Sequence, residues 1–264
     1  MNDKLEAVLS DLEAEGAQLE SWIAPLEAGQ WATPTPAEGW TISHQIAHLA
    51  WTDETSVKAA TDEEAFAVTI KAAMANPEGF VDEAANELAL VPPAELLSFW
   101  QSSRAALVST LRAVPEGTRI PWYGPPMSPT SMATARLMET WAHSHDVAET
   151  LGIETPRNDR AKHVAYLGVR TRDFAHHMRG ETPPGEEFRV ELIAPSGDVW
   201  AWGPEDAAQR VTGDGWDLAL LATRRLHPDD AAVTAVGDDA AHWLTIIQAF
   251  AGLPGTDPVR KAEA

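Results

Sequence analysis

The feature that most restricts the fold of this chain is a change in apolar spacing near Gly152. Before Gly152, apolar residues recur every three to four positions in long segments, which is the spacing of amphipathic helices. Four such segments are long: 2–28, 41–60, 92–114 and the one around 138–148. Their number and length predict an antiparallel helical bundle. An acidic, alanine-rich stretch between the second and third segments is expected to continue as helix, with a break near Asn-Pro-Glu-Gly.

After Gly152 the pattern predicts a small α+β domain, because short alternating segments replace the long helical ones. The expected elements, in chain order, are a helix over 160–178, strands over 188–193 and 199–202, a strand and a helix over 206–226, a strand or loop over 233–238, and a helix over 240–250.

These elements predict four consecutive regions of the chain. Residues 1–155 form the helical bundle, and residues 156–182 form a connecting helix and linker. Residues 183–255 form the C-terminal α+β domain, and residues 256–264 form a disordered tail. The fold class is therefore α plus α+β, with the bundle first.

Charge and hydropathy narrow the class of partner. The formal net charge is −21, and nucleic-acid binding needs clustered basic residues, so nucleic acid is excluded as a partner. No apolar run is long enough to span a membrane, and the N-terminus lacks the pattern of a secretory signal. We expect a cytoplasmic protein that acts on a small molecule, and the sequence does not distinguish a monomer from a dimer.

The chain contains no cysteine. Disulfides, thiolate metal ligands, a cysteine nucleophile and iron–sulfur clusters are therefore excluded. Any metal must be held by histidine, aspartate or glutamate, and any thiol chemistry must use a thiol that the protein binds.

The sharpest chemical signal is the pair Glu139 and His143, which are one helical turn apart. At this spacing a carboxylate oxygen and an imidazole nitrogen can bind one metal ion. His48 lies on another predicted helix and could supply a third ligand, which leaves coordination positions open for catalysis. Nitrogen and oxygen ligands favour zinc, with nickel, manganese and iron as competitors. The alternatives are a hydrogen-bonded core role for His48 and a salt bridge from Glu139 to Arg136, or a solvated position for Glu139.

Three residues near these candidates are expected to have other roles. His44 precedes His48 by one turn and could chelate with it, whereas His145 faces another side of the helix from His143. Asp146 lies three residues after His143 and could orient that ligand, or else serve in a salt bridge or at the helix end.

The segments His48-Leu49-Ala50 and Glu139-x-x-x-His143-x-x-Asp146, with the later α+β part, resemble the mycothiol-dependent maleylpyruvate isomerase family. This family belongs to the DinB-like superfamily of metal-binding four-helix bundles, and the resemblance covers about residues 5–253. Segments 122–128 and 135–143 look like an actinobacterial subgroup of uncharacterised metal-binding proteins.

The resemblance implies an N-terminal DinB-like four-helix bundle and a small sterol-carrier-like C-terminal α+β domain that closes the pocket. It implies a zinc-type site formed by His48, Glu139 and His143. It also implies a catalytic arginine, which corresponds to either Arg224 or Arg225.

The function predicted from the sequence is a metal-dependent enzyme that acts on a small electrophilic, carboxylated metabolite. A low-molecular-weight thiol such as mycothiol is activated at the metal, and the reaction is an isomerisation or an S-transfer. One alternative is a thiol-independent, metal-dependent hydrolase or lyase of specialised metabolism. Another is a non-catalytic protein that binds a metal and a ligand.

Overall fold

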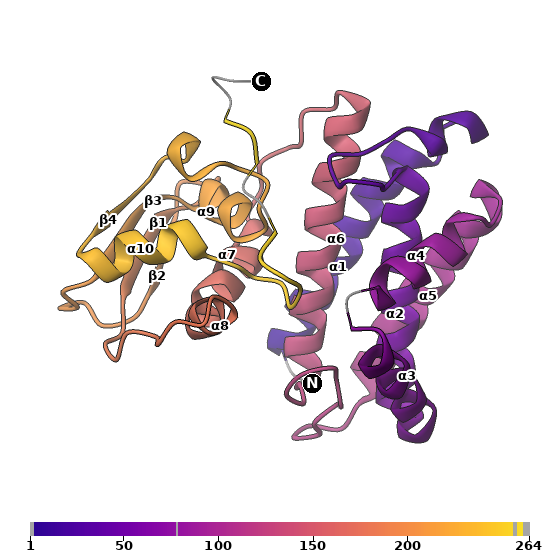
Figure 1. The fold of residues 1–264 in the computed structure, drawn as a ribbon, viewed down its shortest axis with the longest axis horizontal. Helices are drawn as coiled ribbons and strands as arrows, with labels where there is room; N and C mark the ends of the chain where they lie inside the picture. Colours follow the sequence, from indigo (N-terminus) through magenta and orange to yellow (C-terminus); the bar gives the residue numbers. More distant parts are fainter. Residues whose placement is uncertain (1–2, 78, 256–257, 261–264) are drawn as a thin grey trace. The chain divides into compact units, whose positions relative to one another are not determined.

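The computed structural model describes residues 3–77, 79–255 and 258–260 (Figure 1). The chain divides into two compact units, Met1–Thr155 and Pro156–Ala264. Most of the segment 256–264, for which a disordered tail was expected, lies outside the described residues. Among the described helices, none combines the length and apolar character that a membrane crossing needs.

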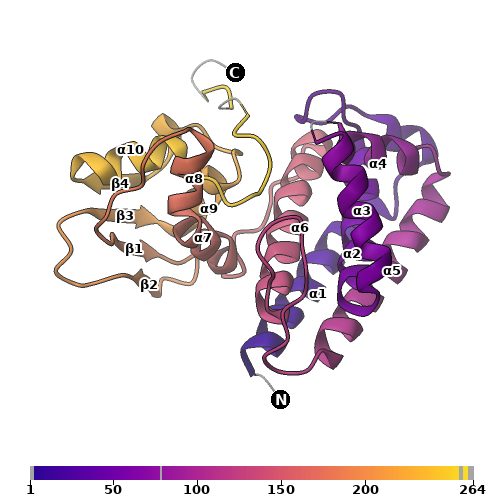
Figure 2. The ribbon, with the colours of Figure 1, turned by 60° about the horizontal axis from the view of Figure 1, so that its bottom comes forward.

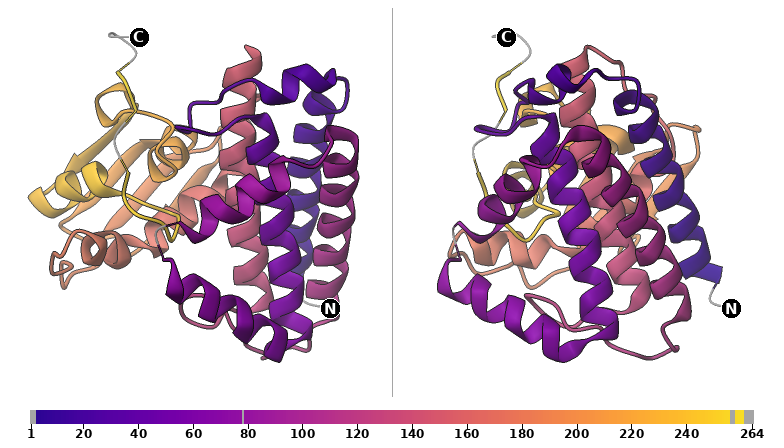
Figure 3. Two further views of the ribbon diagram at one scale, coloured as in Figure 1. Left: turned by 45° about the vertical axis from the view of Figure 1, so that its right-hand side comes forward. Right: turned by 90° about the vertical axis from the view of Figure 1, so that its right-hand side faces the viewer.

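The first unit is built from four long helices that run alongside one another (Figure 3). Each of them packs against at least two of the others, as expected of a bundle. A short 3₁₀ helix η1 (Ala28–Ala32) and two further helices, α3 (Glu63–Ala75) and α4 (Phe80–Ala89), complete the unit. The four long helices are α1 (Asp3–Ile23), α2 (Ile42–Thr61), α5 (Pro93–Ala113) and α6 (Pro129–Leu151).

The core of the bundle explains why the apolar spacing folds this way. Leu19 of α1, Ile46 of α2 and Trp100 of α5 belong to one buried cluster, as does Val147 of α6. Burying each of these side chains contributes about 1.5–3 kcal/mol, which favours packing the four apolar stripes against one another. The cluster fixes α2 and α6 face to face, and these two helices carry the residues of the candidate site.

Both ends of α6 are specified locally. The Ser128 side chain accepts a hydrogen bond from the backbone N–H of Ser131, and Pro129 occupies the first helical position. Gly152 ends the helix in the left-handed conformation, with φ of 66°. The helix that carries Glu139 and His143 therefore has defined limits.

The second unit is a four-stranded sheet with helices (Figure 2). Its strands are β1 (Arg189–Ile193), β2 (Val199–Trp202), β3 (Arg210–Asp214) and β4 (Val233–Val236), in the order β2-β1-β3-β4. The β1–β2 and β3–β4 pairs are antiparallel and the β1–β3 pair is parallel. The helices and the second 3₁₀ helix are α7 (Ala161–Arg170), α8 (Arg172–Met178), α9 (Gly215–Ala222), η2 (Pro228–Asp230) and α10 (Asp238–Ile246).

Alternate residues of the strands form the inner face of this sheet. Val190, Leu192, Trp200 and Val211 are buried, while their strand neighbours are more exposed. This period of two is what the sequence pattern predicted for strands.

One prediction about this unit was wrong in detail. The segment 160–178 was expected to be one helix, but it forms α7 and α8, separated at Thr171. The Thr171 hydroxyl donates both to Leu167 O in its own helix and to Gln248 O, 77 residues later. This tertiary contact accompanies the break, and neither glycine nor proline marks it in the sequence.

Candidate metal centre

His48 is placed by the second helix of the bundle. Thr41 caps α2, because its side chain accepts from the backbone of His44 while the His44 ring accepts from the backbone N–H of Thr41. His48 begins the next turn and is 8% exposed. His44 is thereby committed to the helix cap and to Asn86, 3.1 Å away, so the chelating pair His44–His48 does not form.

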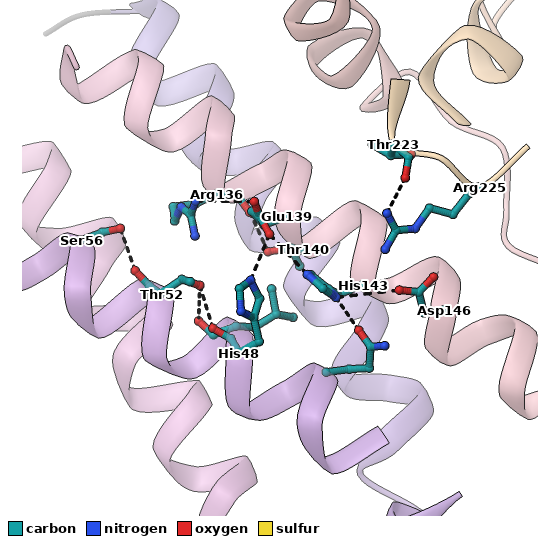
Figure 4. A network of polar contacts seen from close by, with 12 residues as sticks. His48, Thr52, Ser56, Arg136, Glu139, Thr140, His143, Asp146, Thr223 and Arg225 are labelled. Carbon is teal, nitrogen blue, oxygen red and sulfur yellow. Dashed lines mark hydrogen bonds and ion pairs between the residues drawn. The ribbon is translucent and has the colours of Figure 1, made fainter. Parts of the chain in front are cut away.

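Glu139 and His143 project from α6 towards His48 (Figure 4). The Oε2 atom of Glu139 lies 3.1 Å from Nε2 of His48 and 3.3 Å from Nε2 of His143. One donor atom from each residue lies within 4.8 Å of the other two. His48 and Glu139, whose side chains are in contact, are 91 positions apart in the sequence. The structure thus brings the three residues together, as the sequence predicted. Their role as metal ligands stays a prediction.

A relay of hydrogen bonds orients the His143 ring. The hydroxyl of Thr35 donates to Trp40 O over 3.1 Å, so its oxygen accepts from the Gln45 Nε2 amide over 2.8 Å. The amide oxygen of Gln45 is therefore the atom that faces Nδ1 of His143, and it can only accept. Nδ1 must therefore carry a proton, and in the neutral ring this leaves the Nε2 lone pair directed at Glu139.

With this tautomer, His143 and Glu139 present two electron-rich atoms to each other, as the ligands of a metal ion do. A lone pair on His143 Nε2 and a carboxylate oxygen 3.3 Å apart repel each other unless a cation or a proton lies between them. Two imidazole nitrogens and one carboxylate oxygen are ligands of the type that zinc binds in open catalytic sites. The donor set therefore fits a divalent metal ion.

The charge state of Glu139 suits the same role. Burial alone would raise its pKa, but the close contacts with His143 and His48, together with the charge of Arg136, hold the pKa well below its usual value. Glu139 is therefore an anion at neutral pH. The expected alternative, a salt bridge to Arg136, is present only as a 3.9 Å contact to the other carboxylate oxygen.

Arg136 is a residue that the sequence pattern did not identify as functional. It is 5% exposed, and its Nε and Nη1 atoms are buried with no hydrogen-bond partner among the described residues. Its guanidinium lies over the Trp122 ring, 5.3 Å from the centroid. A buried cation with unused donors is costly unless an anion pairs with it, so it is a candidate binding group for an anionic ligand.

Aromatic side chains flank the two histidines. The Trp40 ring is nearly parallel to that of His143, 5.8 Å away at 13°, and lies 5.4 Å from that of His48. Trp51 lies 6.0 Å from His48 and packs against Phe80. Trp40 and Trp51 are only partly buried and border the candidate site.

A buried ion pair between Asp53 and Arg104 lies next to the candidate site. Asp53 of α2 accepts from Arg104 Nε of α5 over 2.7 Å, and Arg104 Nη2 donates to Thr140 of α6 over 2.8 Å. Burial raises the pKa of Asp53, although the adjacent Arg104 acts to lower it. The network joins three helices next to Glu139.

The remaining sequence candidates lie elsewhere. Asp146 Oδ2 is 3.9 Å from His143 Nδ1, beyond hydrogen-bond range, and Gln45 has the orienting role instead. The His145 ring donates to Trp141 O, away from the cluster. Arg224 and Arg225 follow α9 in the second unit, where Arg224 has a φ of 60° and Arg225 donates to Thr223 O. A catalytic role for either arginine stays a prediction.

Comparison with known proteins identifies the family. The family model described as "Mycothiol maleylpyruvate isomerase N-terminal domain" matches residues 12–148, more than half of the chain. The chain belongs to this family. A second family model, described as "Wyosine base formation", matches residues 184–236, the part of the second unit that contains its four strands.

Relatives and solved structures agree with this assignment. Uncharacterized proteins of two Mycobacterium tuberculosis strains are each 57% identical over 247 residues, 94% of this chain and 96% of theirs. A crystal structure of the mycothiol-dependent maleylpyruvate isomerase matches with a TM-score of 0.60 and 18% identity, and that of a mutant with 0.61 and 20%. Each match covers 88% of this chain and 92% of the other.

These matches confirm the fold class, which is a DinB-like helical bundle followed by a small α+β domain. At 18% and 20% sequence identity, the structural likeness establishes the fold. The family is described as a mycothiol-dependent isomerase, which indicates an enzyme with a small-molecule substrate at the level of the family.

Proposed function

We propose that this chain is a metal-dependent enzyme that uses a low-molecular-weight thiol, such as mycothiol, on a small electrophilic and carboxylated metabolite. The observation that carries the proposal is the convergence of His48, Glu139 and His143, with the His143 tautomer set by Gln45. Three protein ligands leave coordination positions for a thiol and a substrate. Membership of a mycothiol-dependent isomerase family supports the choice of thiol.

The ligand set favours zinc over its competitors nickel, manganese and iron. Two imidazoles and one carboxylate suit a borderline metal, and the chain has no thiolate of its own to offer. When bound, such an ion supplies a positive charge that lowers the pKa of a coordinated thiol, so that a thiolate is present at neutral pH. Because the chain contains no cysteine, the nucleophile must come from the thiol cosubstrate.

The residues around the ligands bind and orient the reactants. Glu139 stays ionised and keeps the two imidazoles in place. Arg136 offers buried N–H donors to the carboxylate of the substrate, within the same unit as the ligands. The aromatic rings of Trp40 and Trp51 limit the access of water beside the histidines. Arg224 or Arg225 is a second proposed source of carboxylate binding.

The proposed isomerisation balances without any further reactant. The thiolate sulfur adds to one carbon of a cis double bond conjugated to a carbonyl, and the electron pair moves to the carbonyl oxygen. Rotation about the new single bond follows, and elimination restores a trans double bond and releases the thiolate. In an S-transfer the adduct instead gains a proton on carbon and the carbon–sulfur bond is kept.

Elemental analysis and a thiol-dependence assay together test this proposal. His48→Ala and His143→Ala should each lose one equivalent of metal relative to the unchanged chain, which with mycothiol should consume maleylpyruvate or an electrophilic bimane. Chelator-sensitive turnover without any thiol would replace the proposal with a metal-dependent hydrolase or lyase. Metal binding without turnover of any electrophile, and loss of folding in Glu139→Ala, would indicate a non-catalytic binding protein.

A further inference from the structure

A second cluster of metal-ligand residues lies in the C-terminal unit. Oε2 of Glu181 is 3.0 Å from Nδ1 of His176 and 2.7 Å from Nε2 of His242. The rings of the two histidines are 5.6 Å apart. One donor atom from each of the three residues lies within 4.8 Å of the other two. His176 is 2% exposed.

The backbone conformation after α8 places Glu181 beside His176. Helix α8 ends at Met178, and Gly180, whose φ is 72°, follows its C-cap. The N–H groups of Gly180 and Glu181 bond to the carbonyls of His177 and His176, respectively. This is the Schellman pattern, which needs a residue with positive φ and reverses the chain over the last helical turn. Glu181 is thereby returned to a position beside the His176 ring.

The third residue comes from the last helix. His242 lies on α10, which packs against α8, and its side chain is 47% exposed. Glu181 is 36% exposed, whereas the His176 side chain is 3% exposed. The cluster therefore has a fixed inner ligand and an outer side that is accessible to ions and water.

The chemistry of this cluster repeats that of the first site. In both, a single carboxylate oxygen lies between one nitrogen of each of two imidazoles, at 2.7 and 3.0 Å here and 3.1 and 3.3 Å in the bundle. An ion that replaces the ring protons between these atoms would be bound by two nitrogens and one oxygen. Water would complete its coordination from the exposed side.

We propose that His176, Glu181 and His242 bind a second divalent metal ion of the zinc class and so connect α8 to α10. Nitrogen and oxygen donors of this kind select zinc, cobalt or nickel over calcium or magnesium, which prefer oxygen alone. The second site does not depend on the function proposed for the first, because the two sets of ligands share no residue.

Metal titration of the full chain tests the second site. The metal-free protein is titrated with Zn²⁺ and its metal content is measured after desalting. The chain should bind two equivalents, and His242→Ala and Glu181→Gln should each lose one. His177→Ala is the matched control, because His177 is a neighbouring exposed histidine on α8 outside the cluster. It should keep both equivalents.

Variants of the bundle site separate the two proposals. His143→Ala should keep one equivalent that the added His242→Ala change removes, and Co²⁺ bound to His143→Ala should show the visible absorption of a four-coordinate nitrogen–oxygen site. Equal metal content in His242→Ala, Glu181→Gln and the unchanged chain would overturn the second site and leave a metal-free hydrogen-bonded triad. If His143→Ala and the unchanged chain both bind one equivalent, the bundle site fails and the second site stands.

Discussion

The amide oxygen of Gln45 accepts a hydrogen bond from Nδ1 of His143, and this contact decides which ring nitrogen faces Glu139. The two residues are 98 positions apart and lie on different helices. The other end of the same amide donates to the Thr35 hydroxyl, which in turn donates to Trp40 O, and this holds the amide oxygen towards His143. Gln45 thus prepares His143 to bind a cation through Nε2.

Replacing Gln45 should weaken metal binding while the fold remains intact. In Gln45→Met the side chain keeps its approximate volume but no longer fixes the tautomer of His143. We expect the affinity for Zn²⁺ to fall about 10- to 100-fold, the range found when a residue that orients a ligand is lost. Competition with a chromophoric chelator measures this affinity.

Thr35→Val is a milder test of the same relay. It removes the acceptor that holds the Gln45 amide, but it leaves the amide oxygen beside His143. The loss of affinity should therefore be smaller than in Gln45→Met. Equal affinity in Gln45→Met and the unchanged chain would show that the tautomer of His143 is set in another way.

Arg136 should contribute to substrate binding and to the stability of the metal-free protein. Arg136→Met takes a positive charge away from the buried carboxylate of Glu139, so the metal-free protein should melt at a lower temperature. The same change should raise KM for a carboxylated substrate at least tenfold, since a hydrogen bond to a charged group contributes about 1.5–3 kcal/mol. Metal content should not change.

Parallel kinetics on the three arginines would assign the carboxylate-binding residue. Arg224→Gln and Arg225→Gln are compared with Arg136→Met under the same conditions. If KM rises in only one of the two C-terminal variants and not in Arg136→Met, the carboxylate-binding residue is Arg224 or Arg225, as the family resemblance implies. A change in kcat without a change in KM would argue against carboxylate binding by the residue concerned.

The bundle and the three proposed ligands could be predicted from sequence because helical periodicity is local. Glu139 and His143 share a face through their spacing alone. Gln45 and Arg136 could not be found in this way, since nothing in their sequence neighbourhood shows what they contact. The break at Thr171 and the pairing of His176 with His242 likewise depend on packing between segments that are distant in the sequence.

The buried ion pair of Asp53 and Arg104 should be essential for the stability of the bundle. Arg104→Met would leave the Asp53 carboxylate buried without its cation, and loss of one partner from such a pair costs about 3–5 kcal/mol. Arg112→Ala is the matched control on the same helix. Its ion pair with Glu6 is largely exposed, and such pairs contribute about 0–1 kcal/mol. Thermal unfolding followed by circular dichroism should therefore show a far lower midpoint for Arg104→Met, and similar midpoints for the two variants would contradict this ranking.

Ionised Glu191 should contribute to the free energy of unfolding of the second unit, and this contribution should be lost at low pH. Hydrogen bonds from Arg189 and, across the β1–β3 pair, from Arg210 lower the pKa of Glu191 below its usual value, although partial desolvation opposes the shift. A carboxyl group whose folded pKa is lowered stabilises the fold above its unfolded pKa of about 4.3, and this contribution disappears as the pH falls through the folded value.

Glu191→Gln tests this component because glutamine cannot ionise. The variant should melt below the unchanged chain at pH 7, and the difference should shrink as the pH is lowered from about 5 to about 3, where both side chains are neutral. Glu187→Gln, at an exposed glutamate just before β1, is the control and should show little difference at any pH. A Glu191→Gln difference that stays constant from pH 7 to pH 3 would mean that the loss comes from packing, because only the charged form of Glu191 gains from the two arginines.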